Sequence, residues 1–185
     1  ATPEGRCAIN SAAYERAADG TLSPAGTYPT GGLGTGAGLG SQGALILSDN
    51  GRYLFVVNAG SDEITSFRVR MGELVWADTV SSNGEMPISL THDGRKLVVL
   101  NAGGSGNISA FVVTPSGRLR LLPDSTQPLS NGGVGAAPGP AQVSFTPNRR
   151  QLVVTEKASN LLLTYDVTKD GIQPPETHAS AGQTP

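Results

Sequence analysis

One segment of the sequence returns twice. "SDNGRYLFVVNAG" occupies residues 48–60, "THDGRKLVVLNAG" occupies 91–103, and a looser copy, "TPNRRQLVVTEKA", occupies 146–158. A catalytic motif is needed once, whereas a structural unit that buries its apolar face only by stacking on its neighbours must be repeated. The copies therefore predict a protein built from stacked units of one kind.

Each copy lies inside a longer unit that reads as four short strands. An apolar first strand precedes a polar turn, and Asn-Gly or Asp-Gly steps in that turn tolerate the positive φ of tight hairpins. The second strand, as in "YLFVV", is apolar throughout, which is typical of a strand covered on both faces. The third strand alternates and carries an aromatic residue at Phe67, Phe111 or Tyr165, and a fourth strand follows a Gly-containing turn.

Units of four antiparallel strands predict an all-β fold made of β-propeller blades. Phe67 and Phe111 are 44 residues apart, which lies within the range of propeller repeats. Residues 9–22 are expected to form the third and fourth strands of a half blade, with Tyr14 in the aromatic position. A sandwich of hairpins is the alternative architecture, but it gives no reason for the second strand to recur in register.

We therefore expect a partial propeller with about three to four blades. The predicted units are a half blade at 8–30, blades at 41–82, 85–127 and 139–178, and the start of another blade at 179–185. So few blades would leave apolar faces and strand edges in water. We expect further blades, or a second copy of the chain, to close the ring.

Composition narrows the possible partners. The net charge is -2 and the 13 Lys and Arg are scattered, so nucleic acid is not expected as a partner. No apolar run approaches the ~18 residues of a membrane span, and Cys7 alone can form neither an intrachain disulfide nor a thiolate metal cluster. The chain starts with Ala rather than Met, so we expect processing or truncation. A secreted or periplasmic location is favoured over a cytoplasmic one.

Two Gly-rich inserts precede first strands, at residues 29–43 and 130–142. The earlier insert contains a GxGxxG pattern at Gly38, Gly40 and Gly43, but a strand follows it instead of the helix that a dinucleotide site requires. We therefore expect no cofactor there. Because both inserts occupy the same blade position, they are expected on the same propeller face, as a lid or a contact surface.

The units "LSDNGRYLFVVNAGSDEITSFRV" and "GPAQVSFTPNRRQLVVTEKASNLLLTYDV" resemble the lactonase-like seven-bladed propeller family. That family includes propeller-type 6-phosphogluconolactonases and fungal 3-carboxy-cis,cis-muconate lactonizing enzymes, and the resemblance implies that this chain is about half a family member. Catalytic members typically carry Gly-Pro-Arg-His on the first strand of the blade at 139–165, and a Glu at the end of its second strand. Here Ala141 and Gln142 stand at the Arg and His positions, while Glu156 stands at the Glu position. The resemblance thus implies that Glu156 is the remaining acid–base group.

Asn58 and Asn101 occupy the same blade position as Glu156, so these residues are expected in a ring around one end of the propeller. They could recognise a small ligand, but we favour a structural role for both Asn residues, in a left-handed turn that caps the strand. Glu156 and the adjacent Lys157 are not turn formers, which favours function.

Gln42 and Gln142 lie near the starts of their first strands. They could point into the channel and bind a ligand, or they could cap the strands. The only histidines are His92, expected in an exposed turn, and His178, so neither a Ser-His-Asp triad nor a metal site is expected.

Two functions follow. The first is that of a lactonase-like propeller, which either hydrolyses a small lactone of a sugar acid or catalyses the related lactone-forming cycloisomerase reaction. The alternative is a non-catalytic secreted or envelope scaffold that binds through the Gly-rich loops and the Asn/Glu ring.

Overall fold

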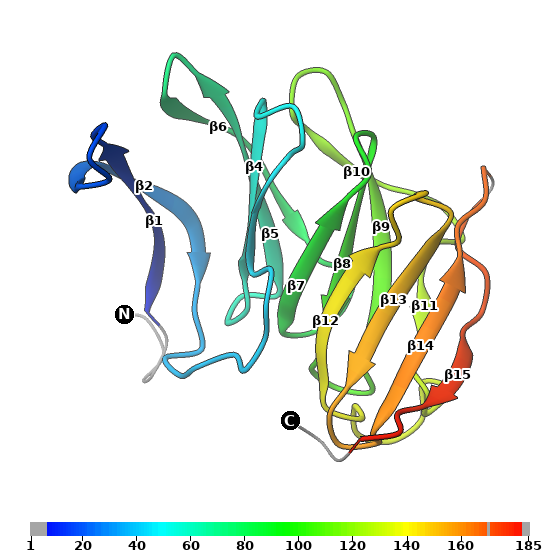
Figure 1. Cartoon of the computed structure of the whole chain (residues 1–185). Helices are drawn as coiled ribbons and strands as arrows, with labels where there is room; N and C mark the ends of the chain where they lie inside the picture. Colours follow the sequence, from blue (N-terminus) through cyan, green and yellow to red (C-terminus); the bar gives the residue numbers. More distant parts are fainter. Residues whose placement is uncertain (1–6, 170, 183–185) are drawn as a thin grey trace.

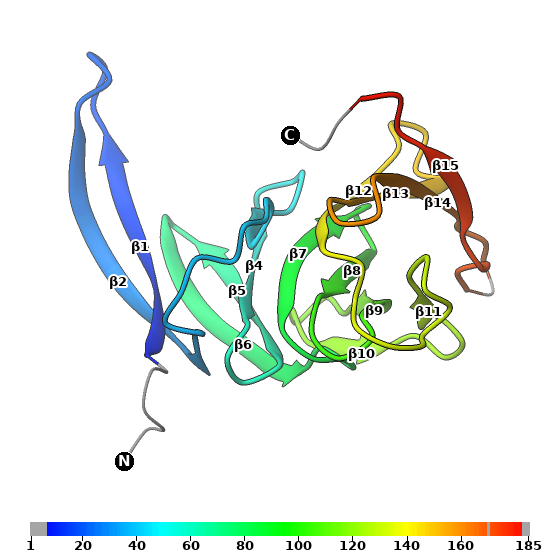
Figure 2. The same ribbon diagram turned by 90° about the horizontal axis from the view of Figure 1, so that it is seen from below.

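A computed structural model describes residues 7–169 and 171–182 of the 185-residue chain, and every regular element in these ranges is a β-strand. The described residues therefore include no helix that could cross a membrane. The strands form four antiparallel sheets, which follow one another around an open arc (Figures 1 and 2). The all-β fold made of antiparallel propeller blades, predicted from the repeats, is confirmed.

The four sheets are numbered here in chain order. The first sheet is a hairpin of β1 (Ala8–Arg16) and β2 (Leu22–Leu33). The second sheet contains β3 (Leu45–Leu47), β4 (Tyr53–Asn58), β5 (Glu63–Arg70) and β6 (Glu73–Ser81). The third sheet contains β7 (Pro87–His92), β8 (Lys96–Asn101), β9 (Asn107–Val113), β10 (Leu119–Leu121) and β11 (Gln127–Pro128). The fourth sheet contains β12 (Pro140–Phe145), β13 (Gln151–Glu156), β14 (Leu161–Asp166) and β15 (Glu176–Ala179).

The aromatic residue of each third strand sits in the same register in three sheets. A second-strand leucine is its cross-strand partner each time, in the pairs Leu54–Phe67, Leu97–Phe111 and Leu152–Tyr165. All three aromatic side chains are buried, with at most 2 % of their surface exposed. Aromatic and aliphatic cross-strand pairs stabilise a sheet, so the recurring letters of the sequence correspond to a recurring contact.

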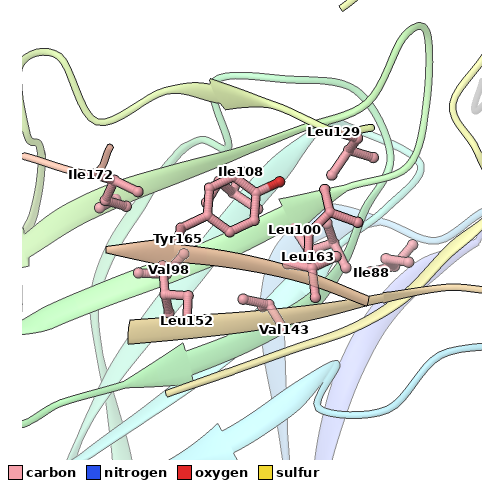
Figure 3. Close-up of a cluster of buried hydrophobic side chains, with 12 residues drawn as sticks. Ile88, Val98, Leu100, Ile108, Leu129, Val143, Leu152, Leu163, Tyr165 and Ile172 are labelled. Atoms are coloured by element: carbon pink, nitrogen blue, oxygen red, sulfur yellow. The ribbon is translucent and has the colours of Figure 1, made fainter. Parts of the chain in front are cut away.

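The hydrophobic cores lie between sheets. Leu97 and Val99 of β8 pack toward the second sheet, while Val98 and Leu100 pack toward the fourth. Successive side chains of a strand point to opposite faces, so the uninterrupted apolar run of β8 has a core on each side. Figure 3 shows the cluster between the third and fourth sheets, in which Tyr165 and Leu163 lie beside Ile108 and Leu100.

The N-terminal half blade differs from the prediction in two ways. β2 continues to Leu33, through "PTGGL", which had been assigned to a Gly-rich insert. Its end pairs with the start of β1, where Ala8 lies opposite Leu33, and also docks on the second sheet, where Thr65 Oγ1 donates to the carbonyl oxygen of Thr30 at 2.8 Å. Tyr14 is 57 % exposed, since β1 pairs only with β2 and has no second strand to supply the leucine partner.

The third sheet also departs from four strands, because β11 pairs with β9 beyond the short β10. At the other end of the chain, β15 ends at Ala179, inside the range predicted to start another blade. Residues 183–185 of that range lie outside the described residues.

Candidate functional site

The strand ends of the fourth sheet surround a pocket of about 540 Å³. Four of the residues proposed from the sequence line it: Gln42, Gln142, Glu156 and Lys157. The antiparallel register explains three of them, because Pro140 pairs with Glu156 and the start of β12 therefore lies beside the end of β13. The loop that precedes β3 supplies Gln42, whose backbone N–H donates to the carbonyl oxygen of Ala141 at 3.4 Å.

Glu156 is buried, with 3 % of its surface exposed, and its carboxylate accepts three hydrogen bonds. Oε1 accepts from the backbone N–H of Ser130 at 3.0 Å, and Oε2 accepts from the hydroxyls of Ser130 at 2.6 Å and Ser159 at 2.5 Å. A carboxylate offers about four lone-pair directions, so one direction on Oε1 has no donor among the residues that the structure describes. Glu156, which lines the pocket, is thus fixed in orientation.

Lys157 brings a positive charge to the same pocket. Its Nζ donates to the carbonyl oxygen of Gly40 at 2.7 Å, which ties the Gly-rich loop to the end of β13. Within the described ranges, no carboxylate lies within 4.0 Å of this ammonium group. Among the described residues Gly40 is the one hydrogen-bond partner of this ammonium group, which leaves two of its three hydrogens for a ligand.

Asn58 and Asn101 lie away from this pocket, fully buried at the ends of β4 and β8. Asn58 accepts from Thr30 Oγ1 at 2.7 Å and donates to Thr65 Oγ1 at 2.9 Å. Asn101 donates to the carbonyl oxygen of Ser82 at 3.2 Å and to Asn107 Oδ1 at 2.8 Å. Neither has a positive φ, so the expected left-handed turn is wrong, and the side chains make the structural contacts instead.

In three blades, the residue at the end of the second strand joins its own sheet to the preceding one by a hydrogen bond. Asn58, Asn101 and Glu156 each bond to the segment at the end of the preceding sheet, at Thr30, Ser82 and Ser130 respectively. We call these three contacts the inter-sheet anchors. Sequence reasoning placed the three residues in one ring but missed their partners, which occur 19 to 28 positions earlier.

His92 is half-buried instead of exposed, so the expectation of an exposed turn is wrong. Its ring centroid lies 5.3 Å from that of Phe55, and its Nδ1 accepts from the N–H of Gly94 at 3.1 Å. Burial lowers the pKa of His92, although the nearby Asp93 and Asp49 oppose this shift. Neither His92 nor the exposed His178 lines the pocket, so neither histidine can act there.

Sheets arranged around an arc, with a core between each pair of neighbours, define this protein as a β-propeller segment. The chain belongs to the lactonase family of seven-bladed β-propellers, whose family model matches residues 4–134. It is 34 % identical over 90 residues to the 6-phosphogluconolactonase of Bacillus subtilis, and that match covers 46 % of this chain and 26 % of the relative.

Solved structures agree on the fold. The periplasmic gluconolactonase of Pseudomonas aeruginosa matches 94 % of this chain with a TM-score of 0.71 and 22 % identity, over 51 % of its own length. A protein from Lactobacillus plantarum matches with the same TM-score of 0.71, 18 % identity, 94 % of this chain and 50 % of its own length. The chain therefore spans about half the length of these structures, as the resemblance implied.

Proposed function

We propose that this chain contributes the ligand pocket of a propeller that hydrolyses a small lactone of a sugar acid. The observation that carries the proposal is the convergence of Gln42, Gln142, Glu156 and Lys157 on one pocket, in a chain of the lactonase family. Its volume of about 540 Å³ suits a small-molecule ligand, since such pockets typically measure about 300–1,000 Å³. The relatives named as lactonases support the substrate class.

The pocket residues suggest how they would act on a lactone. Water attacks the carbonyl carbon while the free lone pair of Glu156 Oε1 accepts a proton from that water. The Lys157 ammonium stabilises the negative charge that develops on the carbonyl oxygen. The ring C–O bond then breaks, and the leaving ring oxygen takes the proton from Glu156, so lactone and water yield a hydroxy acid. The amides of Gln42 and Gln142 are placed to bond to sugar hydroxyls.

The test is hydrolysis of glucono-δ-lactone by the complete protein, followed by acid release at constant pH above the spontaneous rate. Glu156→Gln should lower kcat by about 10²- to 10⁴-fold, the range for loss of a general base. Glu176→Gln changes an exposed carboxylate on β15 of the same sheet and should leave kcat unchanged.

Glu156 is also an inter-sheet anchor, so its variant must be shown to stay folded by its thermal unfolding midpoint. Lys157→Met leaves the carboxylate contacts intact and supplies a second variant, for which we expect a lower kcat/KM. If wild type shows no hydrolysis, or if a folded Glu156→Gln variant retains the wild-type kcat, the proposal is wrong. Binding of the lactone without turnover would instead support a non-catalytic scaffold.

We also propose that further blades or a second copy complete the ring around this pocket. The support is the span of the chain, about half the length of its structural relatives. Intact mass and light scattering on one sample separate the two, because a chain of 18.9 kDa in a particle of twice that mass indicates a second copy. On this proposal the protein would serve carbohydrate metabolism, with a secreted or periplasmic location.

A further inference from the structure

A second pocket, of about 580 Å³, lies at the opposite end of the blades from the candidate site. The start of β4, the end of β5 and the start of β6 line it, together with Pro115 in the turn between β9 and β10. The candidate site lies at the end of β13, where second strands finish. Figure 1 shows the turns that follow β5 and β9 at the other end of the molecule from the end of β13.

Three arginines, Arg52, Arg68 and Arg70, line this second pocket. Glu73 is the one carboxylate among its lining residues, so the lining carries an excess of two positive charges. Across residues 7–169 and 171–182, none of the three guanidinium groups forms an ion pair or a side-chain hydrogen bond. A chain of net charge -2 thus gathers three arginines without ion-pair partners at one concavity, which makes the local potential positive and attractive to an anion.

The pairing of β4 with β5 explains why these arginines line one pocket. Arg68 and Arg70 are two residues apart on β5 and therefore project from the same face of the sheet. Tyr53 is the cross-strand partner of Arg68, and the backbone N–H of Val69 donates to the carbonyl oxygen of Arg52 at 2.9 Å, which places Arg52, directly before β4, beside the end of β5. The sequence separates Arg52 from Arg68 by 16 positions, so the cluster exists only in the folded chain.

The walls of the pocket are held by contacts between two sheets. The Tyr53 hydroxyl donates to the carbonyl oxygen of Pro115 at 3.0 Å, and Ser66 Oγ donates to that of Gly117 at 2.7 Å. The Arg68 stem lies against this turn, since a Cβ on Gly117 would be 3.1 Å from Arg68 Cγ. Both sheets belong to the described chain, so the pocket does not depend on how the propeller ring is closed.

We propose that this arginine pocket binds a phosphate dianion, carried by a small soluble phosphate monoester. Guanidinium groups donate paired hydrogen bonds that match phosphate oxygens, and a dianion balances the two excess charges. Tyr53, Met71 and Val75 add apolar surface beside the arginines, which suits the carbon part of the ester. This site is separate from the proposed lactone pocket and does not rest on that proposal.

The experiment is isothermal titration of the complete protein with inorganic phosphate and with phenyl phosphate at one fixed salt concentration of about physiological strength, where phosphate contacts are not exaggerated. We expect both to bind, with phenyl phosphate tighter because its ring reaches the apolar wall. Arg68→Gln/Arg70→Gln should weaken phosphate binding at least about tenfold, as expected when charge-assisted hydrogen bonds are lost. Arg120→Gln, an exposed arginine on β10 outside the pocket, should bind as wild type does.

The single variant Arg70→Gln tests the site with less risk of misfolding than the double variant, because Arg70 is exposed. It should also weaken phosphate binding. Malonate tests the choice of anion, and malonate binding as tight as that of phosphate would overturn the phosphate assignment. Undiminished phosphate binding by both pocket variants, or no binding to wild type, would overturn the site itself. The Glu156→Gln variant should bind phosphate normally whether or not it hydrolyses a lactone.

Discussion

Gly84 lies directly against the Asn101 anchor, and its replacement by alanine gives a direct test of the inter-sheet anchors. A Cβ at position 84 would lie 2.5 Å from Nδ2 and 2.6 Å from Cγ of Asn101, closer than real Cβ atoms approach other heavy atoms. The Asn101 amide cannot move away freely, because Nδ2 is bonded to Ser82 and Asn107 and the side chain is fully buried.

The cost follows from these contacts. Overpacking costs about 1–3 kcal/mol, and moving the amide would lose two hydrogen bonds of about 1 kcal/mol each. Alanine also stabilises by about 0.4–1 kcal/mol through the unfolded chain, so we expect a net loss of about 2–4.5 kcal/mol for Gly84→Ala. For a domain of this size each kcal/mol corresponds to about 2–4 °C, which gives a fall in Tm of about 4–18 °C.

Urea unfolding and calorimetry measure this loss, and Gly38→Ala is the matched control. A Cβ on Gly38 would meet no atom within 4 Å, so that variant should stay within about 0.5 kcal/mol of wild type. In an Asn101→Ala background the two nearest atoms are gone, and the Cβ at position 101, at 2.8 Å, remains close. The cost of Gly84→Ala should then shrink by at least about 1 kcal/mol, and an equal cost in both backgrounds would refute the reasoning.

Two pH-linked predictions concern groups that the fold buries. Burial lowers the pKa of His92 below 6.5, so the unfolded chain binds this proton more readily and stability should fall as pH drops below about 6.5; His92→Gln should reduce that fall in urea unfolding at pH 7.5 and 5.0. Burial, aided by the Glu156 charge, raises the pKa of Tyr165, so its stabilisation should be lost as pH rises above about 10. Tyr165→Phe removes a hydrogen bond of 2.9 Å to the Pro128 carbonyl and should cost about 1–2 kcal/mol at pH 7 while weakening the alkaline loss; an unchanged unfolding midpoint would contradict this.

The blade strands could be predicted because their signal is local and repeated. The run "KLVVL" is apolar at every position, and the structure shows why, with a core on each face of β8. The half blade lacked such a signal. β2 extends through Gly31 and Gly32 because Leu33 pairs with Ala8 of β1, and Thr30 also bonds to Asn58 of the next sheet, a contact across 28 residues.

The candidate site was predictable in part for the same reason. Glu156 and Gln142 share a strand end by register, and the repeats reveal that register. The anchors were harder to predict, because the partner of an asparagine at the end of a strand is set by how two sheets pack. The arginine pocket was missed altogether, since Arg52 and Arg68 meet only across the pairing of β4 with β5.

Cores placed between sheets, described above, have a consequence for dividing this chain into parts. The second and third sheets each contribute to two different cores, as β8 does with its two apolar faces. A cut at a loop between sheets would look natural, yet it would expose one complete apolar face on each product. A truncated or recombined chain should therefore be more stable when another sheet covers the newly exposed apolar face than when the cut merely falls between two blades. In this molecule the sequence repeats blade by blade, whereas the stable unit is the hydrophobic core between two adjacent sheets.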